Sequence, residues 1–137
     1  DGMGYQDNTK ALLMTRAMAE LTRLGEKLGG TRQTFGGLAG MGDLIVTCTS
    51  MHSRNRRAGI LIGQGKSAQE AMKEIGAVVE GYYAAESIHQ LAQREGVDMP
   101  ICRSIYEVLY HGMAVQDVVS GLMRRAKKDE LTETTWL

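Results

Sequence analysis

Near the start of the chain, apolar residues recur with the spacing of an α-helix, and this pattern constrains the fold more than any other feature. Between residues 8 and 28 they form one helical stripe, made up of Leu13, Ala17, Leu21, Leu24 and Leu28. Only residues 44–49 resemble a strand, and so short a run does not distinguish a strand from a buried helix. We therefore expect an all-α domain with a long, largely buried central helix.

Serine and glycine residues indicate where the next helices begin and end. Gly40 and Gly42 are expected to form a turn that leads into a short apolar helix ending at Thr49. Ser53 is expected to cap a helix that reaches about residue 63. Ser67, with Glu70 three residues later, forms a capping box that opens a helix to about residue 75.

The second half of the chain contains three further helical patterns. They cover residues 80–95, 101–110 and 115–124, and the polar tail after Lys127 is expected to be frayed. Apolar spacing predicts that Tyr83 and Ile105 face the core.

Composition narrows the class of protein. The 137 residues have a net charge of zero and are sufficient for one domain, residues 1–137. No apolar run approaches the roughly 20 residues that span a bilayer, and there is no signal-peptide pattern. Cys48 and Cys102 are isolated thiols, which favours free cysteines and a reducing, cytoplasmic location over a disulfide. The scattered histidines give no reason to expect a metal site.

A basic segment suggests an anion-binding site. Between residues 44 and 69 there is no Asp or Glu, whereas Arg54, Arg56, Arg57 and Lys66 are positively charged. Arg54 also lies at an expected helix N-terminus, where backbone N–H groups favour phosphate. Two alternatives stay open. The first is that the charges are solvated at the surface, which is expected for at least one arginine because Arg56 points away from the other two. The second is a nucleic-acid surface. The segment has no aromatic residue, which weighs against nucleic acid.

Two polar residues in other positions have alternative interpretations. Asp43 is suited either to capping the helix that follows it or to holding a cation in a site, and the two roles are compatible. Thr47 lies one helical turn later, so both side chains can face the same ligand.

Lys10 is either catalytic or a surface lysine. The Gly-x-Gly patterns at residues 2–4 and 40–42 lack a third glycine and a preceding strand, so neither is a dinucleotide-binding loop.

Several separate blocks of sequence resemble one known family. They are residues 7–13 (DNTKALL), 37–49 (GLAGMGDLIVTCT), 53–57 (SRNRR), 79–81 (VEG) and 99–101 (MPI). Together they resemble the C-terminal, substrate-binding domain of bacterial NAD(P)-dependent sn-glycerol-3-phosphate dehydrogenase over nearly the whole chain. The resemblance implies a multi-helix domain of the 6-phosphogluconate dehydrogenase C-terminal-like type. It also implies interconversion of dihydroxyacetone phosphate and sn-glycerol 3-phosphate, which feeds glycerophospholipid synthesis.

The resemblance also implies roles for individual residues. Asp43 matches an acidic residue of the catalytic centre and Thr47 a nearby polar contact. Substrate phosphate is expected at Ser53, Arg54 and Asn55. The cofactor, NAD or NADP, is expected to contact Arg54, Val78 and Glu80 but to be bound mainly by an N-terminal Rossmann domain.

That Rossmann domain and the family's catalytic lysine are expected upstream of Asp1, so the chain is interpreted as a fragment without dehydrogenase activity of its own. Apolar surface left by the missing domain would allow a homo-oligomer. The alternative function is a helical interaction module that binds an acidic partner or RNA through the basic segment. Within the enzymes, the alternative is another two-domain reductase, such as a relative of hydroxyacid dehydrogenases.

Overall fold

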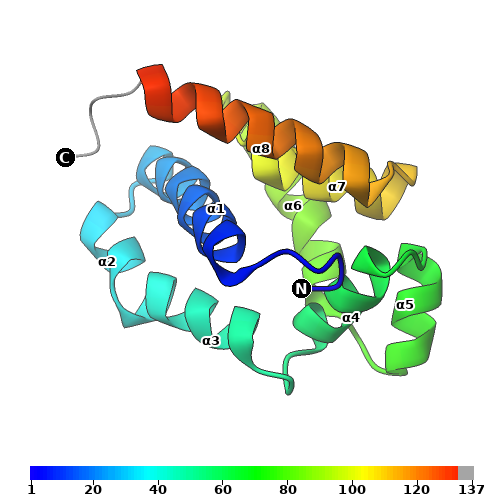
Figure 1. Cartoon of the computed structure of the whole chain (residues 1–137). Coiled ribbons are helices and arrows are strands. Elements are labelled where there is room, and N and C mark those ends of the chain that lie inside the picture. The colour runs from blue at the N-terminus through cyan, green and yellow to red at the C-terminus, as the bar shows by residue number, and fades with distance from the viewer. Residues whose placement is uncertain (133–137) are drawn as a thin grey trace.

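The computed structural model describes residues 1–132, with side chains through residue 125, and within these residues every regular element is a helix (Figure 1). In chain order they are α1 (Asp7–Lys27), α2 (Arg32–Gly36), the π-helix η1 (Leu38–Gly42), α3 (Asp43–Thr49), α4 (Arg54–Gly63), α5 (Ala68–Ile75), α6 (Glu80–Glu95), α7 (Pro100–His111) and α8 (Val115–Thr132). The all-α fold expected from the sequence is confirmed.

The long helix α1 lies in the middle of the molecule and packs against α2, α6 and α7 (Figure 1). Its Leu24 forms the centre of the core together with Ala92 of α6 and Met99, the residue before α7. Leu21, Ile88, Leu91, Val97 and Cys102 pack around these three residues. Burial of this apolar cluster joins the first helix to α6 and α7, which lie in the second half of the sequence.

The expectation that α1 is largely buried was wrong. Only Met18, Glu20 and Leu24 of this helix are buried, and Leu28, at the end of the apolar stripe, is 51% exposed. Periodicity identifies the apolar face of a helix but not what covers it. Here part of the stripe borders an open pocket, described below, instead of another helix.

The expected helix boundaries in the middle of the chain are confirmed. Ser53 Oγ accepts a hydrogen bond from the Arg56 N–H at 3.2 Å, and Ser67 Oγ accepts one from the Glu70 N–H at 3.1 Å. Each serine is therefore the N-cap of the helix that follows it. Helix α6 ends at Gly96, whose φ of 67° is left-handed and favours glycine.

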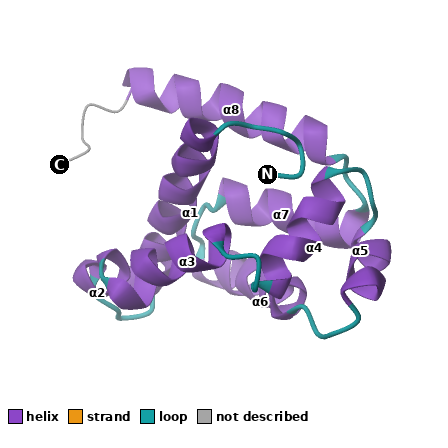
Figure 2. Cartoon of the chain, turned by 60° about the horizontal axis from the view of Figure 1, so that its bottom comes forward, coloured by secondary structure: helices purple, strands orange, loops and turns teal. Residues whose placement is uncertain are grey.

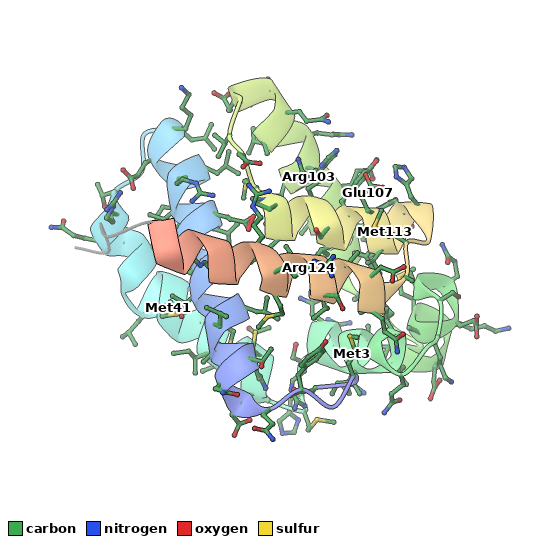
Figure 3. The ribbon with its side chains drawn as sticks, turned by 45° about the horizontal axis from the view of Figure 1, so that its top comes forward. Met3, Met41, Arg103, Glu107, Met113 and Arg124 are labelled. Atoms are coloured by element: carbon green, nitrogen blue, oxygen red, sulfur yellow. The ribbon has the colours of Figure 1, made fainter. Side chains whose placement is uncertain are left out.

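Two expectations about the second half need correction. Helix α8 continues to Thr132 instead of fraying directly after Lys127, and its final turns are rich in strong helix formers. The rest of the expected frayed tail, residues 133–137, lies outside the described residues. Tyr83 and Ile105, expected to face the core, are 60% and 46% exposed, so apolar spacing alone did not decide which side chains are covered. Helix α8 covers the top of the molecule, and its exposed Arg124 lies on that outer face (Figure 3).

A buried carboxylate links α1 to α7. Glu20 is 3% exposed, and its Oε1 accepts a hydrogen bond from the Ile101 N–H at 2.7 Å. Oε2 accepts from the same N–H at 3.0 Å, and Oε1 also lies 3.4 Å from the Cys102 nitrogen. Helix α7 thus receives its N-terminal acceptor from another helix, which fixes the position of the two helices relative to each other.

Candidate functional site

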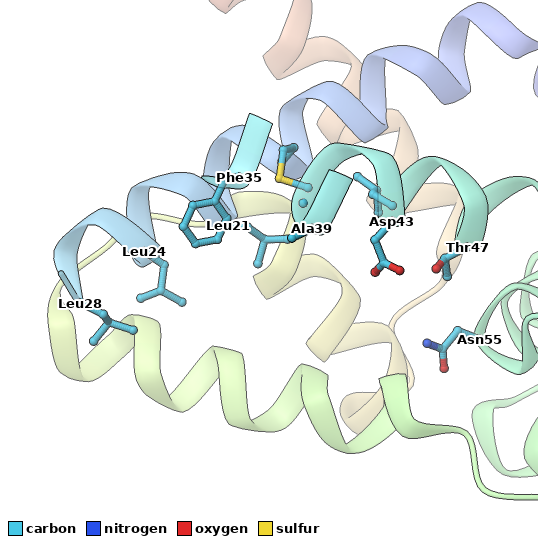
Figure 4. A pocket seen from close by; sticks show the side chains of 12 residues that line it. Leu21, Leu24, Leu28, Phe35, Ala39, Asp43, Thr47 and Asn55 are labelled. Carbon is cyan, nitrogen blue, oxygen red and sulfur yellow. The ribbon is translucent and has the colours of Figure 1, made fainter. Parts of the chain in front are cut away.

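A cavity of about 470 Å³ lies beside α1 and is lined by residues from α1, α2, η1, α3 and α4. Figure 4 shows its two ends. Asp43, Thr47 and Asn55 place a carboxylate, a hydroxyl and an amide at one end, and Leu24, Leu28 and Phe35 form an apolar wall toward the other. The cavity therefore combines a small polar group with an apolar wall, as ligand pockets commonly do.

Asp43 does not cap α3, so the capping interpretation of this residue was wrong. Gly42, with φ −60° and ψ −48°, is itself helical, and the π-helix η1 runs directly into α3. The backbone N–H of Asp43 already donates to the carbonyls of Leu38 and Gly40 in the preceding turn, so the start of α3 has acceptors without a side-chain cap. The carboxylate of Asp43 is directed into the cavity, one helical turn from the Thr47 hydroxyl (Figure 4). The expected glycine turn at residues 40–42 is therefore part of a π-helix, an element that is frequent at functional sites.

Asn55 reaches the cavity from the first turn of α4. Its Oδ1 accepts a hydrogen bond of 2.9 Å from the backbone N–H of Gly81, in the first turn of α6. Figure 2 turns this side of the molecule forward and shows α3 leading into α4, with α6 beside them. Residues from three separate helices therefore meet where the polar end of the cavity lies.

The other four residues singled out in the sequence do not line this cavity. Ser53 uses its hydroxyl to cap α4, and Arg54 is exposed in the first turn of that helix. Val78 is 56% exposed in the segment before α6, and Glu80, the first residue of α6, is also exposed. The Asn55–Gly81 hydrogen bond nevertheless joins the two segments that carry them, so all four lie around one junction of α4 and α6.

Arg56 is held by other groups, contrary to the alternative of a solvated charge. Its side chain is 17% exposed; Nη2 is 2.8 Å from Asp1 Oδ2 and Nε donates to the Cys48 carbonyl at 2.9 Å. Lys10 also pairs with Asp1 Oδ2, at 2.9 Å, so it is not an isolated surface lysine. These groups border a second cavity of about 400 Å³, which shares Thr47 and Asn55 with the first.

Sequence reasoning missed the apolar wall of the first cavity. Phe35 packs so closely on α1 that a Cβ added at Gly25 would lie 2.1 Å from its ring. A glycine inside a helical apolar pattern is a signal of close approach, and Gly25 carried that signal. The wall was missed because the helix that contains Phe35 has only five residues and no clear periodicity.

The thiols and histidines add little chemistry to the site. Cys48 and Cys102 are free, as expected, and burial raises the pKa of both thiols, that of Cys102 to about 12. His89 stacks on Tyr106 with ring centroids 4.0 Å apart, and His111 contacts Glu107. Within the described residues no group of three or more His, Cys, Asp or Glu side chains could hold a metal, and no helix could cross a membrane.

The fold and this cavity define the class: a helical domain with a carboxylate, a hydroxyl and an amide lining one pocket. Residues 1–120 match the family model described as the NAD-dependent glycerol-3-phosphate dehydrogenase C-terminus. The chain belongs to this family.

Individual relatives agree with this assignment. The chain is 62% identical over 130 residues to the glycerol-3-phosphate dehydrogenase [NAD(P)+] of Clostridium perfringens, covering 95% of the chain and 39% of that protein. It is 60% identical over 131 residues to the enzyme of that name from a Thermoanaerobacter species, covering 96% and 40% of the two chains. The 2.1 Å crystal structure of glycerol-3-phosphate dehydrogenase from Coxiella burnetii superposes with a TM-score of 0.87 and 39% identity, over 90% of this chain and 38% of that one.

The chain thus spans about two fifths of the length of these relatives. The family model it matches describes the C-terminal part of glycerol-3-phosphate dehydrogenases, so the chain corresponds to that part of these relatives. The relatives give no support to the alternative of an interaction module for an acidic partner or RNA.

Proposed function

We propose that this domain binds the substrate in an enzyme that interconverts dihydroxyacetone phosphate and sn-glycerol 3-phosphate with NAD(P)H. The observation that carries the proposal is the convergence of Asp43, Thr47 and Asn55 at the polar end of one cavity. This polar end lies beside the basic first turn of α4. The names of the relatives supply the reaction and the NAD(P) dependence.

The phosphate group of the substrate is assigned to the start of α4. The first N–H groups of an α-helix lack intrahelical acceptors and favour an anion. Ser53 Oγ satisfies only the Arg56 N–H in this turn, and no acidic residue lies within α4. Exposed Arg54 supplies a guanidinium that can bind a phosphate through two hydrogen bonds. Ser53 and Asn55 flank it and complete the proposed phosphate segment.

The polar groups in the cavity suit the other end of the substrate. Reduction of a ketone places negative charge on its oxygen, so a positioned proton donor is required. By the resemblance described above, that donor is a lysine in the part of the protein before Asp1. We assign Asp43 the role of orienting that cation, and Thr47 a hydrogen bond to the substrate, because both face the same cavity.

The nicotinamide cofactor supplies or accepts the hydride. We assign its binding mainly to an N-terminal Rossmann domain, with Arg54, Val78 and Glu80 contacting it from the helical side. These three residues suit that role because all are exposed and lie around the junction of α4 and α6. A group bound by a neighbouring domain can reach them without rearrangement of the core.

A chimaera tests the proposal. In the Clostridium perfringens relative, the region matched by this chain is replaced with residues 1–137, and NADH oxidation is measured with dihydroxyacetone phosphate. We expect an active chimaera, whereas the 137-residue chain alone shows no turnover because it lacks the proton donor and the cofactor domain. In the chimaera, Asp43→Asn should lower kcat by at least about tenfold, typical of a lost electrostatic contact in the transition state.

The matched control is Asp117→Asn, a carboxylate in the first turn of α8 that does not line the cavity. It should leave kcat and KM unchanged. An inactive but folded chimaera, or turnover by the isolated chain, would contradict the proposal. A homo-oligomer and a cytoplasmic location stay predictions, the second resting on the two free thiols.

A further inference from the structure

The orientation of the Asn55 amide is determined outside the cavity. An asparagine side chain carries an acceptor oxygen and a donor nitrogen, and only its surroundings decide which of them faces a ligand. Here the Gly81 N–H, 2.9 Å from Oδ1, takes the oxygen. The donor Nδ2 is left to face the cavity that Asp43 and Thr47 also line (Figure 4).

Gly81 is also the residue that allows this contact. A Cβ built at this position would lie 2.8 Å from Oδ1 and 3.0 Å from Cγ of Asn55. Real Cβ atoms essentially never come as close as 2.8 Å to another atom, so a side chain at position 81 requires a shift, and the flexible end of Asn55 is the group that can give way. The clash involves the end of a side chain and not the backbone, so the rest of α6 could stay in place.

The hydrogen bond also meets a need of α6. Val79, the N-cap residue of this helix, has no side-chain acceptor, and the helix makes no capping bond of its own. Asn55 supplies the acceptor from α4 instead, which ties the two helices together at the site. The same bond therefore caps a helix and orients a ligand-facing group.

We infer that Gly81 is a positioning residue: its N–H and its missing side chain hold the Asn55 amide with the donor nitrogen toward the substrate oxygen atoms. This inference rests on the proposed function for its ligand. It predicts that Gly81 affects binding only through Asn55. Apart from this role, glycine lowers the stability of a helix relative to alanine, so Gly81→Ala by itself should not destabilise α6.

Hydrogen exchange measured by NMR on the 137-residue chain tests the orientation without any ligand. Amides in the first turn of a helix normally exchange fast, so slow exchange at Gly81 would report the bond to Asn55. We expect Asn55→Ala to remove this protection and Asn55→Asp, which keeps the acceptor, to retain it. Gly81→Ala should shift the Asn55 side-chain NH₂ resonances. Equal exchange at Gly81 in wild type and Asn55→Ala would overturn the inference.

Titration with sn-glycerol 3-phosphate tests the consequence for binding. Gly81→Ala should weaken binding about tenfold or more, the effect of losing one hydrogen bond to a charged group. The double variant Gly81→Ala/Asn55→Ala should bind no more weakly than Asn55→Ala alone, because both changes remove the same contact. Gly121→Ala in α8 is the control, since a Cβ there meets its nearest neighbouring atom at an ordinary 4.0 Å.

The outcomes are distinguishable. Unchanged affinity in Gly81→Ala, or an additional loss in the double variant, would overturn the positioning role. If the wild-type chain does not respond to sn-glycerol 3-phosphate, the proposed function loses its support in this domain, and the ligand-free exchange data still decide whether Gly81 orients Asn55.

Discussion

Glu20 offers the strongest test of how the fold is held together. This carboxylate is 3% exposed and supplies the acceptor for the Ile101 and Cys102 N–H groups at the start of α7. Pro100 has no N–H, so these are the first two donors of the helix. Removing the carboxylate leaves both donors without the acceptor that the fold provides.

The size of the effect follows from two opposing contributions. A hydrogen bond to a charged group contributes about 1.5–3 kcal/mol, and part of this is offset by the cost of burying the charge. Burial raises the pKa of Glu20 above its ordinary value, although the N–H groups of Ile101 and Cys102 lower it, so the cost of burial is the larger influence. We expect Glu20→Ala to lower the free energy of unfolding by about 2–3 kcal/mol and Glu20→Gln, which keeps an acceptor oxygen, by less than about 1 kcal/mol.

The raised pKa also gives the pH dependence a definite sign. The folded state binds the Glu20 proton more tightly than the unfolded state does, so the stabilisation is complete below the unfolded value of 4.5. It is lost as the pH rises through the higher pKa of the folded state. The free energy of unfolding of wild type relative to Glu20→Gln should therefore fall as the pH is raised from 4.5 toward neutrality.

Urea denaturation followed by circular dichroism measures these differences at several pH values. Glu26→Gln is the control: it lies on the same helix, is more exposed, and pairs with Arg32 at 3.0 Å. It should change stability by less than about 1 kcal/mol. The reasoning would be refuted if Glu20→Gln destabilised the protein as much as Glu20→Ala. It would also be refuted if the free energy of unfolding of wild type, minus that of Glu20→Gln, rose with pH.

Three further predictions concern single side chains. In the chimaera, Arg54→Ala should weaken substrate binding by about 1.5–3 kcal/mol without changing stability, since the side chain is exposed; an unchanged KM would count against its phosphate role. Tyr110→Phe removes the hydroxyl that donates to the Tyr82 carbonyl at 2.6 Å but keeps the ring stack. Urea denaturation should therefore show a free energy of unfolding lower by about 0.5–1.5 kcal/mol, and an unchanged value would contradict the hydrogen bond. Burial raises the pKa of Cys102 to about 12, so this thiol should resist iodoacetamide at pH 8 in the folded chain and react after unfolding. Mass spectrometry measures the modification, and rapid reaction of the folded chain would contradict the burial.

Much of the local structure could be read from the sequence because it depends on neighbouring residues. Ser53 and Ser67 cap their helices with hydrogen bonds to residues three positions later, and Pro100 begins α7. Gly96 ends α6 in a left-handed conformation. Spacing within α3 likewise placed Asp43 and Thr47 on one face, where both border the cavity. Each of these contacts lies within one or two helical turns, so the residue types alone predict it.

Other features depend on elements that are distant in the sequence. Asn55 meets Gly81, and Glu20 meets Ile101, across 26 and 81 residues, and no local pattern indicates either pairing. Solvated surface charge stayed an open alternative for the arginines, and the sequence did not indicate that Arg56 pairs with Asp1, which lies 55 residues away. The sequence by itself determined the longer helices, the basic segment and the family resemblance, since these follow from residue type and spacing. Only the packing of the helices decided which polar groups face the cavity, because hydrogen-bond partners and burial are properties of the assembled core.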